Sequence, residues 1–170
     1  DEERLFATLD EADRVTAEPF ARWKASLDER LAARFGCSVG ALRPWHYADP
    51  FFQDVPAEGG VDLNEHFAGR DLVELTTRTF DGLGLETRPI LERSDLFPRA
   101  GKSQHAFCID IDRAGDTRVL ANVVPDQYWM DTMLHELGHG VFNAGLEPGL
   151  PWLLRDCHLV VTEGIAILMG

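Results

Sequence analysis

The sequence is poor in cysteine and in long apolar runs, and each shortage excludes a class of protein. Its 170 residues contain only three cysteines, which are widely spaced and never form a C-x-x-C pair. A disulfide framework or a cysteine-based structural zinc site is therefore not expected. No apolar run reaches the roughly 20 residues that a membrane-spanning helix needs, so the chain is expected to be soluble.

Positive charge is also scarce. The formal net charge is −13, and the only lysines are Lys24 and Lys102. Nucleic acids and anionic membranes are bound through basic patches, so neither is an expected partner. The chain begins without methionine and shows no signal peptide, so both cytoplasmic and exported locations stay open. The sequence does not predict an oligomeric state.

The spacing of apolar residues is mostly helical. It predicts helices over 1–13 and 17–35, the second of which begins after Thr16 as N-cap and ends at Gly36. A further helix is predicted from Asp62 to about Phe80. We expect one domain over 1–170, in which residues 1–100 are helical.

After the predicted helices, the period of the apolar residues changes to two. Residues 104–110 and 117–124 alternate or run apolar, and the turn-like segment 113–116 separates them, which predicts an antiparallel hairpin. Residues 101–170 are thus expected to hold this hairpin followed by helices. The predicted fold class is mainly α, with a small antiparallel β-hairpin.

The most informative stretch is His135-Glu136-Leu137-Gly138-His139. Two histidines four apart lie about one helical turn from each other, so both can bind one metal ion. Neutral imidazole is a natural zinc ligand, and zinc lowers the pKa of a bound water to about 7. Glu136 is placed to take a proton from that water. Asp126 and Gly145 are the predicted start and stop of the helix.

A catalytic zinc needs a third protein ligand and an open position. Glu163 is the preferred candidate, because it lies in the apolar stretch 159–169, where a lone carboxylate needs a partner. His158 is its main competitor, and on a helix it would lie well off the face of Glu163. The downstream candidates are Glu147, Asp156, Cys157, His158 and Glu163.

Together, the HExxH motif and the downstream Glu163 resemble the gluzincin arrangement of angiotensin-converting enzyme and its bacterial relatives, close to thimet oligopeptidase and neurolysin. Residues 103–108 are similar to the family's His-Ala strand, which holds the backbone of a peptide substrate. Three further segments, 31–36, 42–44 and 80–85, also resemble the family. The resemblance extends over most of the chain. It implies a zincin-type helical segment, in which residues 101–170 hold the small antiparallel β-hairpin before the HExxH helix and the metal-binding helices.

The resemblance implies zinc-dependent hydrolysis of short peptides, of peptidyl-dipeptidase or, as the runner-up, endo-acting oligopeptidase type. It implies Zn²⁺ on His135, His139 and Glu163, with Glu136 as general base. His105 and Ala106 would bind substrate, although His105 is equally explained as a strand histidine bonded to backbone. The alternative is a non-catalytic fragment or pseudo-enzyme with a structural or empty metal site.

Two departures from the family pattern limit these expectations. Family members are several hundred residues long and place a histidine and a tyrosine that stabilise the reaction intermediate beyond the ligand glutamate. The chain is therefore expected to be a central fragment that is poorly active by itself. In addition, Ile167 stands where the converting-enzyme pattern has an aspartate that supports the metal centre.

Overall fold

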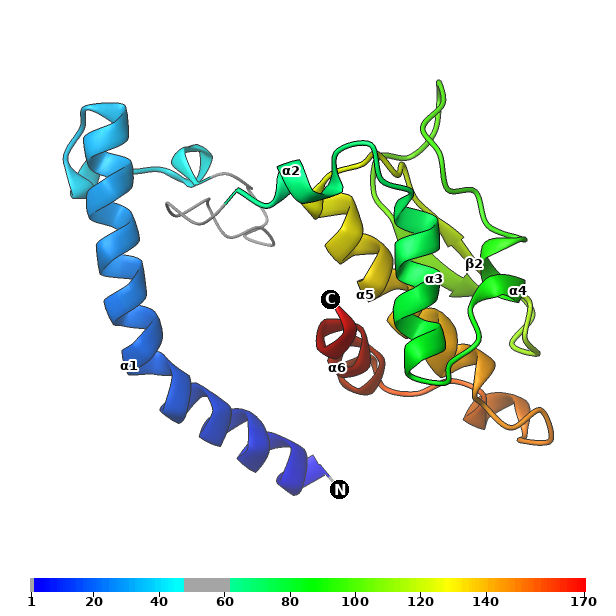
Figure 1. Cartoon of the computed structure of the whole chain (residues 1–170). Helices are drawn as coiled ribbons and strands as arrows, with labels where there is room; N and C mark the ends of the chain where they lie inside the picture. The colour runs from blue at the N-terminus through cyan, green and yellow to red at the C-terminus, as the bar shows by residue number, and fades with distance from the viewer. Residues whose placement is uncertain (1, 48–61) are drawn as a thin grey trace. The chain divides into compact units, whose positions relative to one another are not determined.

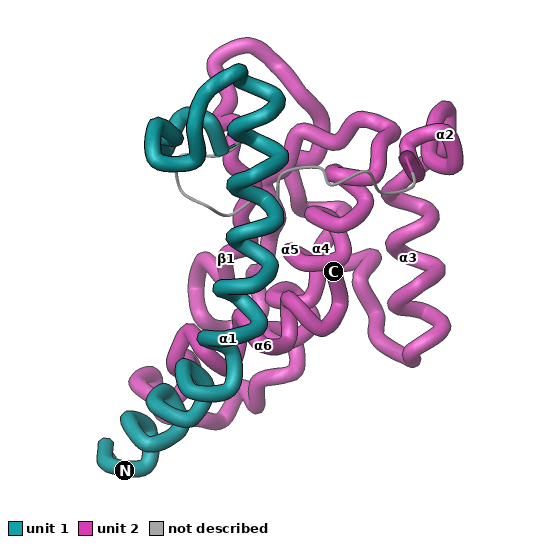
Figure 2. The backbone as a smooth tube through the Cα atoms, turned by 90° about the vertical axis from the view of Figure 1, so that its left-hand side faces the viewer, with its two compact units in different colours: residues 1–61 teal, residues 62–170 magenta. Residues whose placement is uncertain are grey.

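A computed structural model describes residues 2–47 and 62–170 (Figure 1). The chain divides into two compact units, residues 1–61 and 62–170 (Figure 2). The boundary between the units lies inside residues 1–100, which were predicted to be helical. That the whole chain forms one domain stays a prediction. No helix in the described ranges is both long enough and apolar enough to cross a membrane.

The first unit is built on one long helix, α1 (Glu2–Phe35), instead of the two helices that the sequence predicted. Thr16 is not an N-cap, because its hydroxyl donates to the carbonyl of Ala12 in the preceding turn, at 2.7 Å. Pro19 lies inside the helix, where proline removes one backbone hydrogen bond and favours a bend. The helix is continuous but bent (Figure 1).

Two short 3₁₀ turns, η1 (Val39–Ala41) and η2 (Pro44–His46), follow α1. The hydroxyl of Tyr47 donates to Oδ1 of Asp28 at 2.6 Å, and Nζ of Lys24 lies 2.6 Å from Oδ2 of the same residue. These bonds tie the end of this segment back to the C-terminal half of α1.

The second unit is organised around its longest helix, α5. Helix α5 contacts both strands of the hairpin and the helices α2, α3 and α6. Its residues Met133 and Leu137 are fully buried and join apolar side chains of α3, α4 and β2 in one core. The elements, in order, are α2 (Asn64–Phe67), α3 (Leu72–Gly82), α4 (Arg88–Leu91), β1 (Phe107–Asp110), β2 (Thr117–Leu120), α5 (Gln127–Ala144), η3 (Trp152–Leu154) and α6 (Leu159–Met169) (Figure 1).

The helix predicted from Asp62 to Phe80 is two helices, α2 and α3. Gly69 separates them with a φ of 70°, a left-handed conformation that glycine adopts without strain. Asp71 then caps α3, since its carboxylate accepts a hydrogen bond from the backbone N–H of Glu74 at 3.0 Å. The prediction of one helix was wrong because the apolar spacing continues across this interruption.

The predicted hairpin is confirmed, with shorter strands. Strands β1 and β2 are antiparallel, from the pair Phe107 and Leu120 to the pair Asp110 and Thr117. On its other side β2 exchanges backbone hydrogen bonds with Asp95, at 3.0 Å each. The unit is thus mainly helical, with a two-stranded hairpin packed against α5.

Candidate metal centre

Helix α5 has the limits that the sequence predicted. Asp126 is its N-cap and accepts a hydrogen bond from the backbone N–H of Trp129 at 2.8 Å, and Gly145 follows its last residue. The helical turn between His135 and His139 puts both imidazoles on one side of α5, with ring centroids 5.0 Å apart. The spacing of the motif therefore produces a pair of nitrogen donors.

Helix α6 brings Glu163 to this pair. The two helices touch at Gly138, where an added Cβ would lie 2.8 Å from the backbone Cα of Ala166. His158, the competing ligand candidate, is the N-cap of α6, and its Nδ1 accepts from the backbone N–H of Val160 at 3.2 Å. Close packing of the helices therefore presents Glu163 to α5, while His158 caps the helix.

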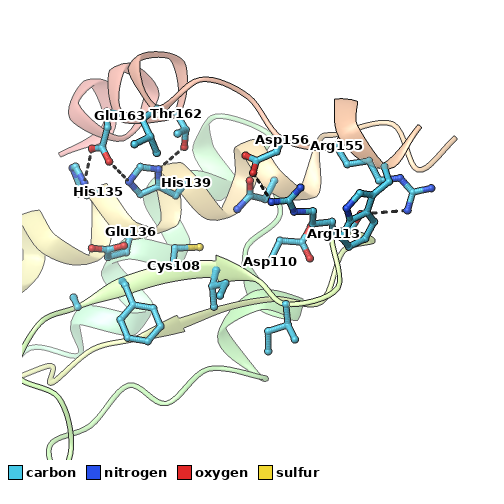
Figure 3. Close-up of a pocket in the computed structure, with 17 residues that line it drawn as sticks. Cys108, Asp110, Arg113, His135, Glu136, His139, Arg155, Asp156, Thr162 and Glu163 are labelled. Atoms are coloured by element: carbon cyan, nitrogen blue, oxygen red, sulfur yellow. Dashed lines mark hydrogen bonds and ion pairs between the residues drawn. The ribbon is translucent and has the colours of Figure 1, made fainter. Parts of the chain in front are cut away.

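Each oxygen of the Glu163 carboxylate faces one imidazole (Figure 3). Oε2 lies 3.5 Å from Nε2 of His135, and Oε1 lies 3.6 Å from Nε2 of His139. One donor atom from each of the three residues lies within 4.8 Å of the other two. Ligands held at about 2.0–2.1 Å from a tetrahedral zinc would lie about 3.3 Å apart, and the two distances from Glu163 to the imidazoles are close to this value. Imidazole nitrogens and carboxylate oxygens are also donors that zinc binds.

The reason for choosing Glu163 from the sequence does not hold, although Glu163 is the carboxylate that meets the histidines. Its side chain is 49 % exposed, so it is not buried among apolar residues. Its neighbours Leu159, Val160 and Val161 are exposed as well. Glu147, Asp156 and Cys157, the other candidates, lie outside the His-His-Glu group.

The surroundings of His139 favour its neutral form. Burial lowers its pKa, and the neighbouring His135 lowers it further, while the carboxylate of Glu163 acts in the opposite direction. A neutral imidazole keeps a lone pair for a metal ion. This favours a metal-ligand role for His139 over a charged ion pair with Glu163.

Thr162 is a site residue that the sequence analysis missed. Its Oγ1 lies 2.6 Å from Nδ1 of His139 (Figure 3). Its only sequence signal was a hydroxyl residue directly before Glu163, which does not reveal a contact with another helix. Ile167, where the family pattern has a supporting aspartate, is 68 % exposed.

Glu136 lies between α5 and the hairpin, next to Cys108 (Figure 3). It is 8 % exposed, and the backbone N–H of Cys108 acts to lower the pKa of its carboxyl group. Burial, followed by the negative charge of Glu163, raises the pKa of Glu136 to about 7. A carboxylate with this pKa can both accept and return a proton near neutral pH.

A cleft of about 580 Å³ lies over the three donors and Glu136. Strand β1 lines one side of it, from Ala106 onward. At its far end Nη2 of Arg113 pairs with Oδ2 of Asp156 at 2.9 Å, and the guanidinium lies 5.2 Å from the ring of Trp152. These contacts tie the hairpin turn to the connection between α5 and α6 (Figure 3).

Of the two residues expected to bind substrate, one lines this cleft and the other does not. Ala106 is one of its lining residues, whereas His105 is exposed and is not among them. The carbonyl of His105 accepts a hydrogen bond from the hydroxyl of Ser103 at 3.4 Å. A substrate-binding role for either residue stays a prediction.

The raised pKa of Glu136 predicts a pH-dependent cost to folding in the metal-free protein. Below about pH 4.5 the carboxyl is protonated in both folded and unfolded chains; as the pH rises to about 7, only the unfolded chain loses the proton readily. Stability is therefore lost across that window. We expect Glu136→Gln to be more stable than wild type by about 1–3 kcal/mol at pH 8 and nearly equal to it at pH 4.5.

Urea unfolding of both metal-free proteins at several pH values measures this difference. Other carboxyl groups titrate in both proteins, so their contributions cancel in the comparison. A difference in unfolding free energy that does not change between pH 4.5 and pH 8 would contradict the perturbed pKa.

Comparison with known proteins adds no further assignment. No protein-family model matches the chain, and a search of curated proteins finds no significant match. The resemblance to the gluzincins therefore rests mainly on the HExxH motif, Glu163 and residues 103–108.

Proposed function

We propose that this chain is the zinc-binding segment of a metallopeptidase that hydrolyses short peptides. The observation that carries the proposal is the meeting of His135, His139 and Glu163 within 4.8 Å. Glu136, which is buried beside them and has a raised pKa, supplies the base. Two imidazoles, one carboxylate and an adjacent glutamate are the groups that zinc-dependent hydrolysis requires.

The proposed chemistry assigns a separate role to each part of the site. A zinc ion held by the three donors would polarise a peptide carbonyl and lower the pKa of a bound water to about 7. Glu136 takes the proton from the attacking water and delivers it to the leaving amine.

Strand β1 is the proposed support for the substrate. In the described part of the chain it pairs with β2 alone, and it lines the cleft beside Glu136. An extended peptide can lie along such an edge and pair through its main chain. The half-exposed side chains of Phe107 and Ile109 would then contact the peptide.

The exposure of the site favours catalysis over a structural metal. Three protein donors leave a fourth tetrahedral position, whereas structural zinc sites are closed by four. The Glu163 side chain is 49 % exposed and borders the cleft, so a metal ion held by the three donors would be within reach of water and substrate in the cleft.

Zinc analysis of purified variants tests the proposal. We expect about one zinc per wild-type chain and little in His139→Ala, because losing one of three protein donors opens the site. His66→Ala removes an exposed histidine of α2 and is the matched control that should keep its zinc. Stoichiometric zinc in His139→Ala would refute the assignment.

A further inference from the structure

Thr162 differs from the other helical threonines in the direction of its hydroxyl. The hydroxyls of six others each donate to the carbonyl four residues earlier in the same helix: Thr8, Thr16, Thr76, Thr77, Thr79 and Thr132. This is the usual bond of a helical threonine. The Oγ1 atom of Thr162 instead lies 2.6 Å from Nδ1 of His139, on the neighbouring helix.

We propose that Thr162 is a positioning residue for the metal centre, which fixes the ring of His139 so that Nε2 faces the metal position. This inference rests on the zinc site of the proposed function and adds the group that orients one of its ligands. Thr162 does not belong to the donor set itself.

The proposal follows from the two nitrogens of the imidazole. Only one of them can face Glu163, and Nε2 does so at 3.6 Å from Oε1. When Nε2 binds a metal, Nδ1 carries the proton and donates a hydrogen bond to the Thr162 hydroxyl oxygen. Turning the ring over would break this bond and move Nε2 away from the other two donors.

Helix α6 therefore contacts both nitrogens of one imidazole through consecutive residues. Thr162 bonds Nδ1, and Glu163 faces Nε2 (Figure 3). The His139 side chain is 13 % exposed, against 32 % for His135, so the bond is partly shielded from water. A shielded hydrogen bond orients a ring more strongly than one that competes with solvent.

Zinc affinity, measured by competition with a chromophoric chelator at pH 7.5, tests this role. Thr162→Val keeps the shape of the side chain without the hydroxyl, and we expect it to bind zinc about 10–100-fold more weakly. Thr162→Ala, which also lacks the hydroxyl and suits a helix, should lose a similar factor. Thr162→Ser restores the hydroxyl and should recover most of the affinity.

The visible spectrum of the Co²⁺-loaded proteins gives a second readout, because it reports the geometry of the ligands. It should change in Thr162→Val and return in Thr162→Ser. Thr79→Val is the matched control, since Thr79 bonds only its own helix, to the carbonyl of Leu75 at 3.0 Å. Urea unfolding of the metal-free variants identifies any loss of folding.

The outcomes separate this inference from the proposed function. Wild-type zinc affinity and an unchanged cobalt spectrum in folded Thr162→Val would overturn the role of Thr162 and leave the zinc site standing. A wild-type chain that binds no zinc would overturn both. Weaker binding in Thr162→Val and Thr162→Ala, with recovery in Thr162→Ser, would establish the role.

Discussion

Replacing Glu136 with glutamine is expected to lower peptide hydrolysis at least ~10²-fold while zinc stays bound. Glutamine has the shape of glutamate and fills the same buried position. It cannot take a proton from water. Because Glu136 lies outside the His-His-Glu group, the donors remain intact.

The test pairs a rate with a metal content. Hydrolysis of a blocked short peptide at saturating zinc is compared between wild type and variant in the complete metallopeptidase of which we propose this chain to be a segment, and zinc is measured in the same samples. Glu147→Gln, an exposed carboxylate in the loop after α5, is the control that should keep the wild-type rate. Loss of zinc in Glu136→Gln would make Glu136 a ligand, and an unchanged rate would remove it from the mechanism.

The same substitution has opposite expected effects on activity and on stability. Burial beside the charge of Glu163 raises the pKa of Glu136 to about 7 and makes the ionised carboxylate costly in the folded chain. Glutamine removes that cost together with the base. A more stable but inactive variant is the pattern expected of a site where folding stability is given up for reactivity.

Parts of the fold with strong local signals could be predicted from the sequence. Helix α5 carries a side-chain cap at Asp126 and a glycine after its last turn, and both limits are confirmed. The hairpin is confirmed by its change to a period of two and by the turn between its strands. In both cases the deciding interactions are between residues close in sequence.

The helix boundaries that were predicted wrongly are those where one residue type is compatible with two backbone structures. A threonine hydroxyl can cap a helix or bond the previous turn, and Thr16 does the latter. Proline can start a helix or bend one, and Pro19 lies inside α1. Between α2 and α3, Gly69 and Asp71 interrupt a spacing that is still helical in period. The backbone conformation that decides each case depends on more than the neighbouring residues.

The site residues divide in the same way, into those that local sequence predicts and those that depend on packing between helices. The positions of His135, Glu136 and His139 relative to one another follow from one helix, so spacing alone predicts them. Glu163 meets them only because α6 packs on α5, and its side chain is half exposed although its neighbours in sequence are apolar. Thr162 was missed because its partner lies on the other helix. Packing between helices is the part that local sequence does not specify.

That packing leads to a second large expected effect, at Gly138. An alanine Cβ at this position would lie 2.8 Å from Cα and 3.4 Å from N of Ala166, and both atoms are backbone. Backbone atoms cannot rotate away as a side chain can, so α6 must move. Because α6 carries Glu163, we expect Gly138→Ala to weaken zinc binding at least ~10²-fold, more than a change that only reorients a ligand.

Gly164→Ala is the matched control, since it makes the same substitution in α6 directly beside Glu163. An added Cβ there meets no atom within 4 Å, and alanine favours a helix over glycine by about 0.5–1 kcal/mol. It should keep wild-type zinc affinity and unfold at a slightly higher urea concentration. Chelator competition on both variants gives the result. Wild-type zinc affinity in Gly138→Ala would mean that α5 and α6 can move apart at Gly138 without loss of the site. The contact between the two helices would then not set the position of Glu163, the third ligand.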